Sequence, residues 1–176
     1  MIRPAEERDL PDILALASAA FTKVEVACVH ELLDASLHEP RQRDYLFLCY
    51  VDGDQVVGFA CYGPTPLTAA TFSLYWICVG RAYREHGVGS ALVAEIEAQI
   101  ARQGGNLLLV ETSSTPQYSA ARRFYSQHGF KRLARVRDFY AAGDDMIMYG
   151  KRSLGPEGED IGGARTWTIP RPGVHL

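Results

Sequence analysis

The order of apolar and polar positions near the start of the chain predicts two helices behind a short N-terminal strand. Apolar residues recur at helical spacing from Asp9, a residue type that favours the cap position, and Pro11 suits a first helical turn. A second helical pattern follows Thr22, which has the spacing of a capping box with Glu25, and Pro40 ends it. We therefore expect two helices before the first long strand.

The middle of the chain changes from helical to strand-like patterning. Residues 45–51 and 55–62 are rich in aromatic and β-branched side chains and flank an Asp-Gly-Asp turn, which predicts a β-hairpin. Residues 73–79 are apolar almost throughout, and 107–112 read as another buried strand. These four segments are expected to form the centre of a sheet.

Helical and strand patterns alternate in the second half of the chain. Residues 87–102 and 117–128 have helical spacing, and 130–136 and 145–151 read as two closing strands joined by a turn-rich segment. The predicted order is β-α-α-β-β-β-α-β-α-β-β. This order indicates a mixed α+β fold in which helices cover both faces of one sheet.

The composition changes after Lys151, where a segment rich in glycine and proline begins. We therefore predict one domain over residues 1–152 and a C-terminal tail over 153–176. Trp167 is the largest apolar residue of the tail. We favour docking of this side chain on the body or on a second subunit, with a loosely held tail as the alternative.

Charge and composition exclude several classes of function. The net charge is 18 − 21 = −3, which argues against nucleic acid or an anionic membrane as a partner. No apolar run approaches the ~20 residues of a membrane span, and the charged N-terminus is unlike a signal peptide, so a cytoplasmic protein is expected. Four cysteines stand among apolar residues and are interpreted as buried thiols. The scattered histidines predict no metal site.

The stretch from Leu74 to Ser90 combines a strand, a glycine-containing loop and a helix start, which suits pyrophosphate binding. A helix N-terminus offers unpaired N–H groups and a partial positive charge. No GxxxxGK[ST] string occurs, which argues against nucleoside triphosphates. A dinucleotide site is a less favoured alternative, because Leu92 stands where the third glycine belongs and seven residues separate the strand from Gly87.

Another glycine-loop pattern fits better. The loop from Arg84 to Ser90 matches [RQ]-x-x-G-x-[GA], and AARRFYSQHGF, which ends at Phe130, resembles A-x-x-x-Y-x-x-x-G-F. Together with the strand at Trp76 to Val79, these motifs resemble the GNAT N-acetyltransferase family, most specifically over residues 74–130. The resemblance implies the acyl-CoA N-acyltransferase fold, with a central, mostly antiparallel, splayed sheet flanked by helices.

The resemblance also implies which residues bind acetyl-CoA. The pantetheine arm is expected along the backbone of Ile77, Cys78 and Val79, where an N–H would polarise the thioester carbonyl. The family often has an asparagine seven residues before its tyrosine; here that position is Tyr118, a candidate contact that departs from the pattern. The diphosphate is expected on the loop formed by Arg84, Glu85, His86, Gly87, Val88, Gly89 and Ser90.

Two residues are the candidates for catalysis. By resemblance, Tyr125 is the general acid that protonates the departing thiolate, since a phenol is protonated at neutral pH. The alternative for Tyr125 is a core tyrosine beside Phe124. Glu111 is the candidate base for the amine; the alternative is a strand-end carboxylate that accepts hydrogen bonds from the next loop.

The acceptor is the least specified part of the prediction. Proteins that look like this one acetylate a primary amine, and we expect a small amine, an amino acid or a peptide as the partner, with a homodimer left open. Two other functions compete: a CoA-binding regulatory module without turnover, and the less favoured dinucleotide-binding oxidoreductase. Aromatic and acidic residues that would suit a cationic amine stand at Tyr62, Tyr75, Asp138, Tyr140, Asp144 and Asp145.

Overall fold

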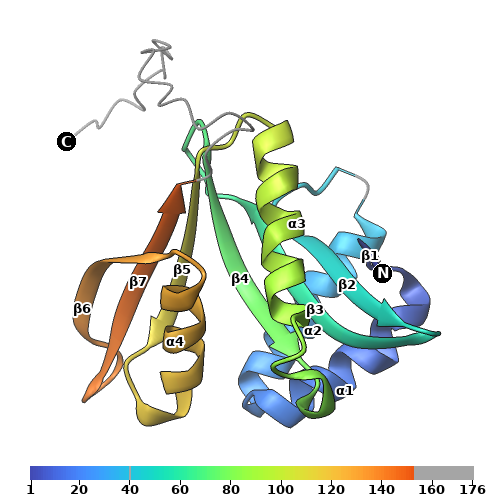
Figure 1. Cartoon of the computed structure of the whole chain (residues 1–176), viewed down its shortest axis with the longest axis horizontal. Helices are drawn as coiled ribbons and strands as arrows, with labels where there is room; N and C mark the ends of the chain where they lie inside the picture. Colours follow the sequence, from blue (N-terminus) through green and yellow to red (C-terminus); the bar gives the residue numbers. More distant parts are fainter. Residues whose placement is uncertain (40, 153–176) are drawn as a thin grey trace.

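The computed structural model describes residues 1–39 and 41–152, and the predictions for Pro40 and for the tail with Trp167 lie outside these residues. The described chain is one mixed sheet with helices on both faces (Figure 1), as predicted. The strands are β1 (Ile2–Pro4), β2 (Leu46–Asp52), β3 (Gln55–Pro64), β4 (Thr71–Val79), β5 (Leu107–Ser113), β6 (Lys131–Ala141) and β7 (Asp144–Arg152). The helices are α1 (Leu10–Ala20), α2 (Lys23–His38), α3 (Val88–Arg102) and α4 (Ser119–Gln127), with short 3-10 turns η1 (Glu7–Asp9), η2 (Arg81–Tyr83) and η3 (Pro116–Tyr118).

The starts of the first two helices differ in how they are capped. α2 has the predicted capping box: Thr22 Oγ1 accepts from the Glu25 N–H, and Glu25 Oε2 accepts from the Thr22 N–H at 2.8 Å. Asp9 stands at the N-cap of α1 as predicted, but its side chain makes no hydrogen bond to that helix. Its buried carboxylate instead accepts two hydrogen bonds from Arg3, at 2.6 and 2.8 Å, and one from the Glu6 N–H. A paired charge satisfies this buried carboxylate better than one helix N–H would.

The seven-stranded sheet has the order β1-β2-β3-β4-β5-β7-β6 and opens at its centre. All neighbouring strands are antiparallel except β4 and β5, which run parallel. Pairing between these two strands begins at Thr71 with Leu107 and ends at Leu74 with Val110. Residues 75–79 and 111–113 then continue on diverging paths, which gives the predicted splayed sheet (Figure 1).

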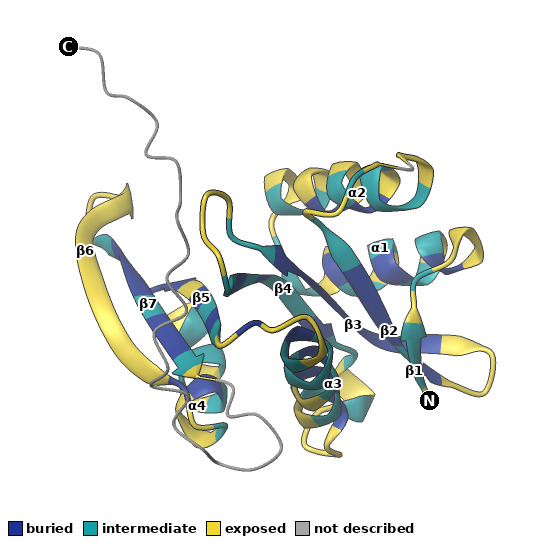
Figure 2. Ribbon diagram, turned by 90° about the horizontal axis from the view of Figure 1, so that it is seen from above, coloured by how far each residue is buried: buried dark blue, intermediate teal, exposed yellow. Residues whose placement is uncertain are grey.

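Helices cover the two faces of the sheet in separate layers. Figure 2 shows α1 and α2 on one face and α3 and α4 on the other. Each layer has its own hydrophobic core, because each helix turns one apolar stripe towards the sheet. Fully buried residues of the helices include Ile13, Ala17, Val29 and Leu33 on one face and Leu92, Ile96 and Ile100 on the other.

Three of the four cysteines are buried as expected, but Cys28 is exposed. It lies on α2 next to Val29, which takes the inward position, so the helical period turns Cys28 outwards. No group of three or more metal-ligating side chains occurs among residues 1–39 and 41–152. Within the same part of the chain, no helix is long and apolar enough to span a membrane.

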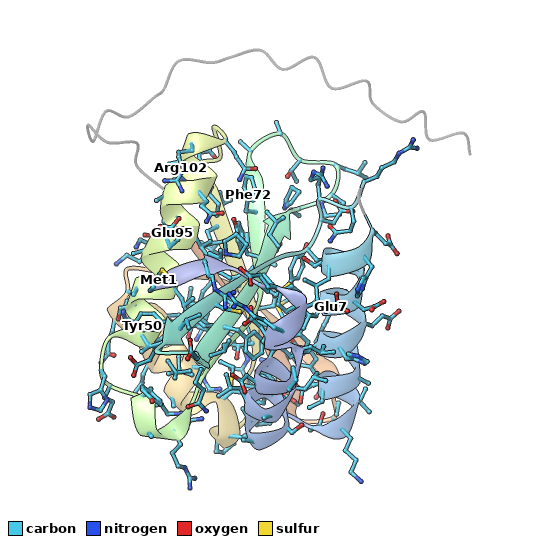
Figure 3. The ribbon with its side chains drawn as sticks, turned by 90° about the vertical axis from the view of Figure 1, so that its right-hand side faces the viewer. Met1, Glu7, Tyr50, Phe72, Glu95 and Arg102 are labelled. Carbon is cyan, nitrogen blue, oxygen red and sulfur yellow. The ribbon has the colours of Figure 1, made fainter. Side chains whose placement is uncertain are left out.

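The two edges of the sheet have different partners. At one edge, the amino group of Met1 donates to the Val51 carbonyl at 2.8 Å and Ile2 pairs with Tyr50; Figure 3 labels Met1 and Tyr50 on this side. The other edge is β6, and every residue of this strand is exposed (Figure 2). β6 extends to Ala141, so the prediction that residues 137–144 form a long turn is wrong.

A bulge explains why residues 137–141, which extend a predicted strand of the last hairpin, have the composition of a turn. The pairing register of β6 and β7 shifts between Val136 and Ala141, and Asp138 has a positive φ of 50°. Its N–H donates to Asp145 Oδ1 at 2.9 Å, and its own carboxylate accepts from the Gly143 N–H at 2.6 Å. Turn-forming residues thus build an irregularity within a strand.

Candidate active site

The open centre of the sheet holds a cleft of about 1480 Å³. Its walls come from residues 73–79 of β4 and 109–113 of β5, and pairing between these two segments ends at Leu74 and Val110. The loop before α3, the start of α2, and η3 with α4 complete the lining. The divergence of two parallel strands therefore creates the site, and both layers of helices reach it.

The predicted phosphate loop lies at one end of this cleft. Gly87 precedes α3 with a φ of 82°, in the left-handed region that favours glycine. A Cβ on Gly89 would lie 3.1 Å from Phe124 Cε2, so this glycine also permits α3 to approach α4 closely. The Arg84 Nε donates to the Val79 carbonyl at 3.2 Å, which ties the loop back to β4. The first-turn N–H groups of α3 face no intrahelical acceptor.

Most of the cofactor candidates line the cleft, and two do not. Val88 is only 4 % exposed and belongs to the core beneath α3, and His86 lies outside the lining with its Nδ1 2.7 Å from the Arg84 carbonyl. Cys78 is a buried thiol whose pKa burial raises to about 11, so it is neutral at physiological pH. The candidates that line the cleft are Ile77, Cys78, Val79, Arg84, Glu85, Gly87, Gly89, Ser90 and Tyr118.

Two cleft residues near the loop were not identified from the sequence. Arg123 and His128 of the segment containing α4 line the cleft beside Ser90. His128 Nδ1 lies 2.7 Å from the Phe124 carbonyl, which can only accept, so this nitrogen carries a proton. In the neutral ring, Nε2 then accepts from the Ser90 hydroxyl at 2.7 Å. This bond joins α3 and α4 across the cleft, a contact that spacing along the chain does not reveal.

Tyr125 projects into the cleft from the core beneath α3 and α4. It is 5 % exposed, and its ring packs against Phe124, Phe130 and Tyr149 at centroid distances of 5.6, 5.6 and 6.0 Å. Burial raises the pKa of the phenol well above its ordinary value, so the group is protonated at neutral pH. The hydroxyl has no hydrogen-bond partner among the residues that the structure describes, so its proton is available to a ligand.

Glu111 lies on the β5 wall of the cleft and faces the other side of the sheet from Tyr125. Leu108 and Val110 of β5 belong to the core beneath α3, so the alternation of the strand directs Glu111 towards the α1–α2 side. The residue is exposed, and its carboxylate has no hydrogen bond or ion pair within the described chain. Burial raises the pKa of the nearby Tyr140 phenol, and the negative charge of Glu111 raises it further.

Comparison with known proteins identifies the family. Residues 42–132 match the sequence model of the acetyltransferase (GNAT) domain. A GNAT-family protein from Desulfovibrio desulfuricans is 36% identical in sequence, with a TM-score of 0.80 over 88% of this chain and 99% of that chain. The chain belongs to the GNAT acetyltransferase family. It is therefore an acyltransferase, and the family predicted from the Arg84–Ser90 loop and the FYSQHGF segment is confirmed.

More distant solved structures share the fold. An aminoglycoside 6'-N-acetyltransferase complexed with coenzyme A is 17% identical, with a TM-score of 0.69 over 88% of this chain and 97% of that chain. The ribosomal-protein-S18-alanine N-acetyltransferase of Escherichia coli is 20% identical, with a TM-score of 0.70 over 90% and 97%. No curated protein matches the sequence significantly.

Tyr118, at the position where GNAT enzymes often have an asparagine, contacts the helical layer across the cleft. Its hydroxyl donates to Glu25 Oε1 at 2.9 Å. Burial, together with this bond to a carboxylate, raises the pKa of Tyr118 to about 12. Burial would raise the pKa of Glu25 as well, but hydrogen bonds from Thr22 and Tyr118 outweigh it and lower that pKa. The pair therefore consists of a neutral phenol and an ionised carboxylate.

Only half of the acceptor candidates of this GNAT chain line the cleft, namely Tyr75, Tyr140 and Asp144. Tyr62 is fully buried beneath α3, and its hydroxyl donates to Gln99. The buried Asp145 carboxylate is paired with Arg135 and accepts from the Asp138 N–H. Asp138 and Asp145 are therefore both outside the lining of the cleft. Strand alternation separates Asp145 from Asp144, which points towards β5 and the cleft.

Proposed function

We propose that this chain transfers the acetyl group of acetyl-CoA to a primary amine by direct attack. The observation that carries the proposal is that a buried, protonated Tyr125 and an exposed Glu111 line one cleft from the two faces of the sheet. A general acid and a general base are the two groups that direct acyl transfer to an amine requires. The separate cleft residues Arg84, Gly87 and Gly89 have the character of a diphosphate site.

The shape of the cleft fits a pantetheine arm. Beyond Leu74, β4 has no strand partner on the side that faces β5, so the backbone of residues 75–79 has polar groups open to the cleft. An extended ligand can pair with such an edge as an added strand does. At the other end, Arg84 and Arg123 supply positive charge and α3 supplies the amides of its first turn. The related aminoglycoside enzyme crystallised with coenzyme A supports this assignment.

The reaction then follows from the placement of Glu111 and Tyr125 on the two faces of the sheet. The amine enters from the α1–α2 side as an ammonium ion, and Glu111 takes a proton from it, directly or through water. The lone pair of the neutral amine attacks the thioester carbonyl carbon, so that the C–N bond forms and the C–S bond breaks. Tyr125 gives its proton to the departing sulfur, and the extra proton on the amide nitrogen returns through water to the Tyr125 phenolate, so the products are an amide and a free thiol. No covalent acyl-enzyme is required.

Two measurements together test this proposal. Thermal unfolding with acetyl-CoA, NAD or ATP is expected to show stabilisation by acetyl-CoA alone, whereas stabilisation by NAD would favour a dinucleotide enzyme. Release of free thiol is then followed with a panel of alkylamines, diamines, aminoglycosides and peptides with free N-termini. Turnover with any amine supports the proposal. Binding of acetyl-CoA without thiol release on any member of the panel would instead indicate a regulatory module.

A further inference from the structure

The charged residues of the cleft are divided between its two openings. The cations Arg84 and Arg123, together with His128, lie at the α3–α4 side, where Glu85 is the accompanying acid. The α1–α2 side has three carboxylates in its lining and no cation: Glu25, Glu111 and Asp144. No ion pair to any of these three occurs within the part of the chain that the structure describes. One opening thus attracts anions and the other cations.

Two of the carboxylates on the α1–α2 side, Glu25 and Asp144, are held in place on separate elements. Glu25 stands in the first turn of α2 and is fixed by Thr22 and by the Tyr118 hydroxyl. Asp144 Oδ1 accepts from the Ser113 hydroxyl at 2.6 Å and from the Ser114 N–H at 3.2 Å. The network leaves Asp144 Oδ2 without a partner in the described residues. These groups are therefore positioned in advance of any ligand.

Aromatic side chains connect the three carboxylates. Burial and the bond to Glu25 raise the pKa of Tyr118 most. Asp144 and Tyr140 are close enough to raise this pKa further. Tyr140 in turn is close to both Glu111 and Asp144. Phe21 and Trp76, with ring centroids 5.1 Å apart, also line this side. Aromatic faces beside carboxylates are a favourable environment for ammonium groups.

A second feature, on the α3–α4 side of the same cleft, indicates where the reacting end of a ligand lies. Tyr125 is a polar side chain, 5 % exposed, whose hydroxyl has no partner among residues 1–39 and 41–152 although it lines the cleft. A hydroxyl without a protein partner at the wall of a cleft can donate to a bound molecule. The reacting centre therefore lies between Tyr125 and Glu111, and the remaining two carboxylates lie beyond it on the acceptor side. A monoamine would use Glu111 alone.

We propose that the natural acceptor is a small diamine or polyamine with a second cationic group, which Glu25 and Asp144 recognise while Glu111 serves the amine that reacts. This inference rests on the proposed acetyl transfer and adds the acceptor class to it. Tyr118 is a positioning residue in this scheme, because it orients the Glu25 carboxylate. The second cation determines which amines are used, and the chemical step itself is unchanged.

The test compares α,ω-diamines of increasing length with n-alkylamines of equal chain length, using thiol release to obtain kcat/KM. The wild-type protein is expected to prefer the best diamine at least about tenfold, the usual effect of one or two hydrogen bonds to a charged group. Glu25→Gln and Asp144→Asn should each reduce this ratio, mainly through KM for the diamine. The matched controls Glu31→Gln, exposed on the same helix, and Asp54→Asn, in the β2–β3 turn, should retain it.

A measurement without any substitution keeps the test independent of folding. Because salt screens charges near the surface, the diamine preference of the wild-type protein should fall as ionic strength rises, while kcat/KM for the monoamine changes little. Equal use of diamines and monoamines at every length would overturn this inference and leave the acetyl transfer intact. Absence of turnover with every amine would overturn the transfer itself.

Discussion

Replacement of Tyr125 by Phe removes one hydroxyl and leaves the ring in its place. The ring packs against Phe124, Phe130 and Tyr149, and these contacts persist in the variant. The hydroxyl makes no hydrogen bond within the described residues, so no internal bond is lost. A typical internal hydrogen bond contributes about 1 kcal/mol to stability, and this substitution removes none. We therefore expect the free energy of unfolding to change by less than about 1 kcal/mol.

The catalytic effect should be much larger than the effect on stability. A positioned general acid contributes about 10²–10⁴-fold to a rate, which corresponds to about 3–5 kcal/mol of barrier. Since burial raises the pKa of Tyr125 above the ordinary value of a phenol, the wild-type group stays protonated through the neutral range. The loss in kcat should therefore be nearly constant with pH in that range.

Thiol release gives kcat, and calorimetry gives the affinity for acetyl-CoA and the unfolding transition. The matched control is Tyr149→Phe, which removes the hydroxyl of a neighbouring buried ring that does not line the cleft. We expect the control to keep wild-type turnover. Wild-type turnover in Tyr125→Phe across the pH range would refute the assignment, and so would a loss shared equally by both variants.

Three further predictions concern the base, the loop and the fold. Glu111→Gln should lower kcat about 10²-fold and remove the acid limb of the pH profile; an unchanged profile would place the base elsewhere. Gly87→Ala, at a φ of 82°, should cost about 1–2 kcal/mol and weaken acetyl-CoA binding, both read from unfolding with and without ligand; an unaltered affinity would contradict the loop assignment. The hydrogen bonds that Arg3 donates to Asp9 lower the pKa of the Asp9 carboxyl. The ionised carboxylate therefore stabilises the fold at pH values above the pKa that Asp9 has in the unfolded chain. In urea unfolding, the advantage of wild type over Arg3→Ala, about 2 kcal/mol at neutral pH, should therefore fade as pH falls below about 4; a constant difference would rule out this linkage.

The sequence predicted the elements of the site better than their relations to one another. Helical spacing and the capping box at Thr22 placed the helices, because these are local properties of backbone and neighbouring side chains. Glycine and turn residues were less reliable: Asp138 and Gly143 suggested a long loop, but they belong to a bulged hairpin that pairing with β7 stabilises.

The acceptor side shows most clearly what local pattern does not contain. Tyr62, Asp138 and Asp145 were expected to contact the amine, yet strand alternation and pairing with Gln99 and Arg135 direct them elsewhere. Glu25 was identified only as part of a capping box. Its bond to Tyr118 joins residues far apart in the sequence, and their proximity follows from how α2 and η3 reach the cleft from different layers.

The sequence by itself determined the family, the loop at Arg84 to Ser90 and the order of helices and strands along the chain, because glycine positions and apolar periods are local. Only the tertiary structure decided where β4 and β5 part, and therefore which side chains share the cleft. The pairing ends at Leu74 and Val110, and the cleft exists because the two strands then diverge. Its division into a cationic and an anionic opening comes from the two helical layers, which long-range packing brings to opposite faces of the sheet.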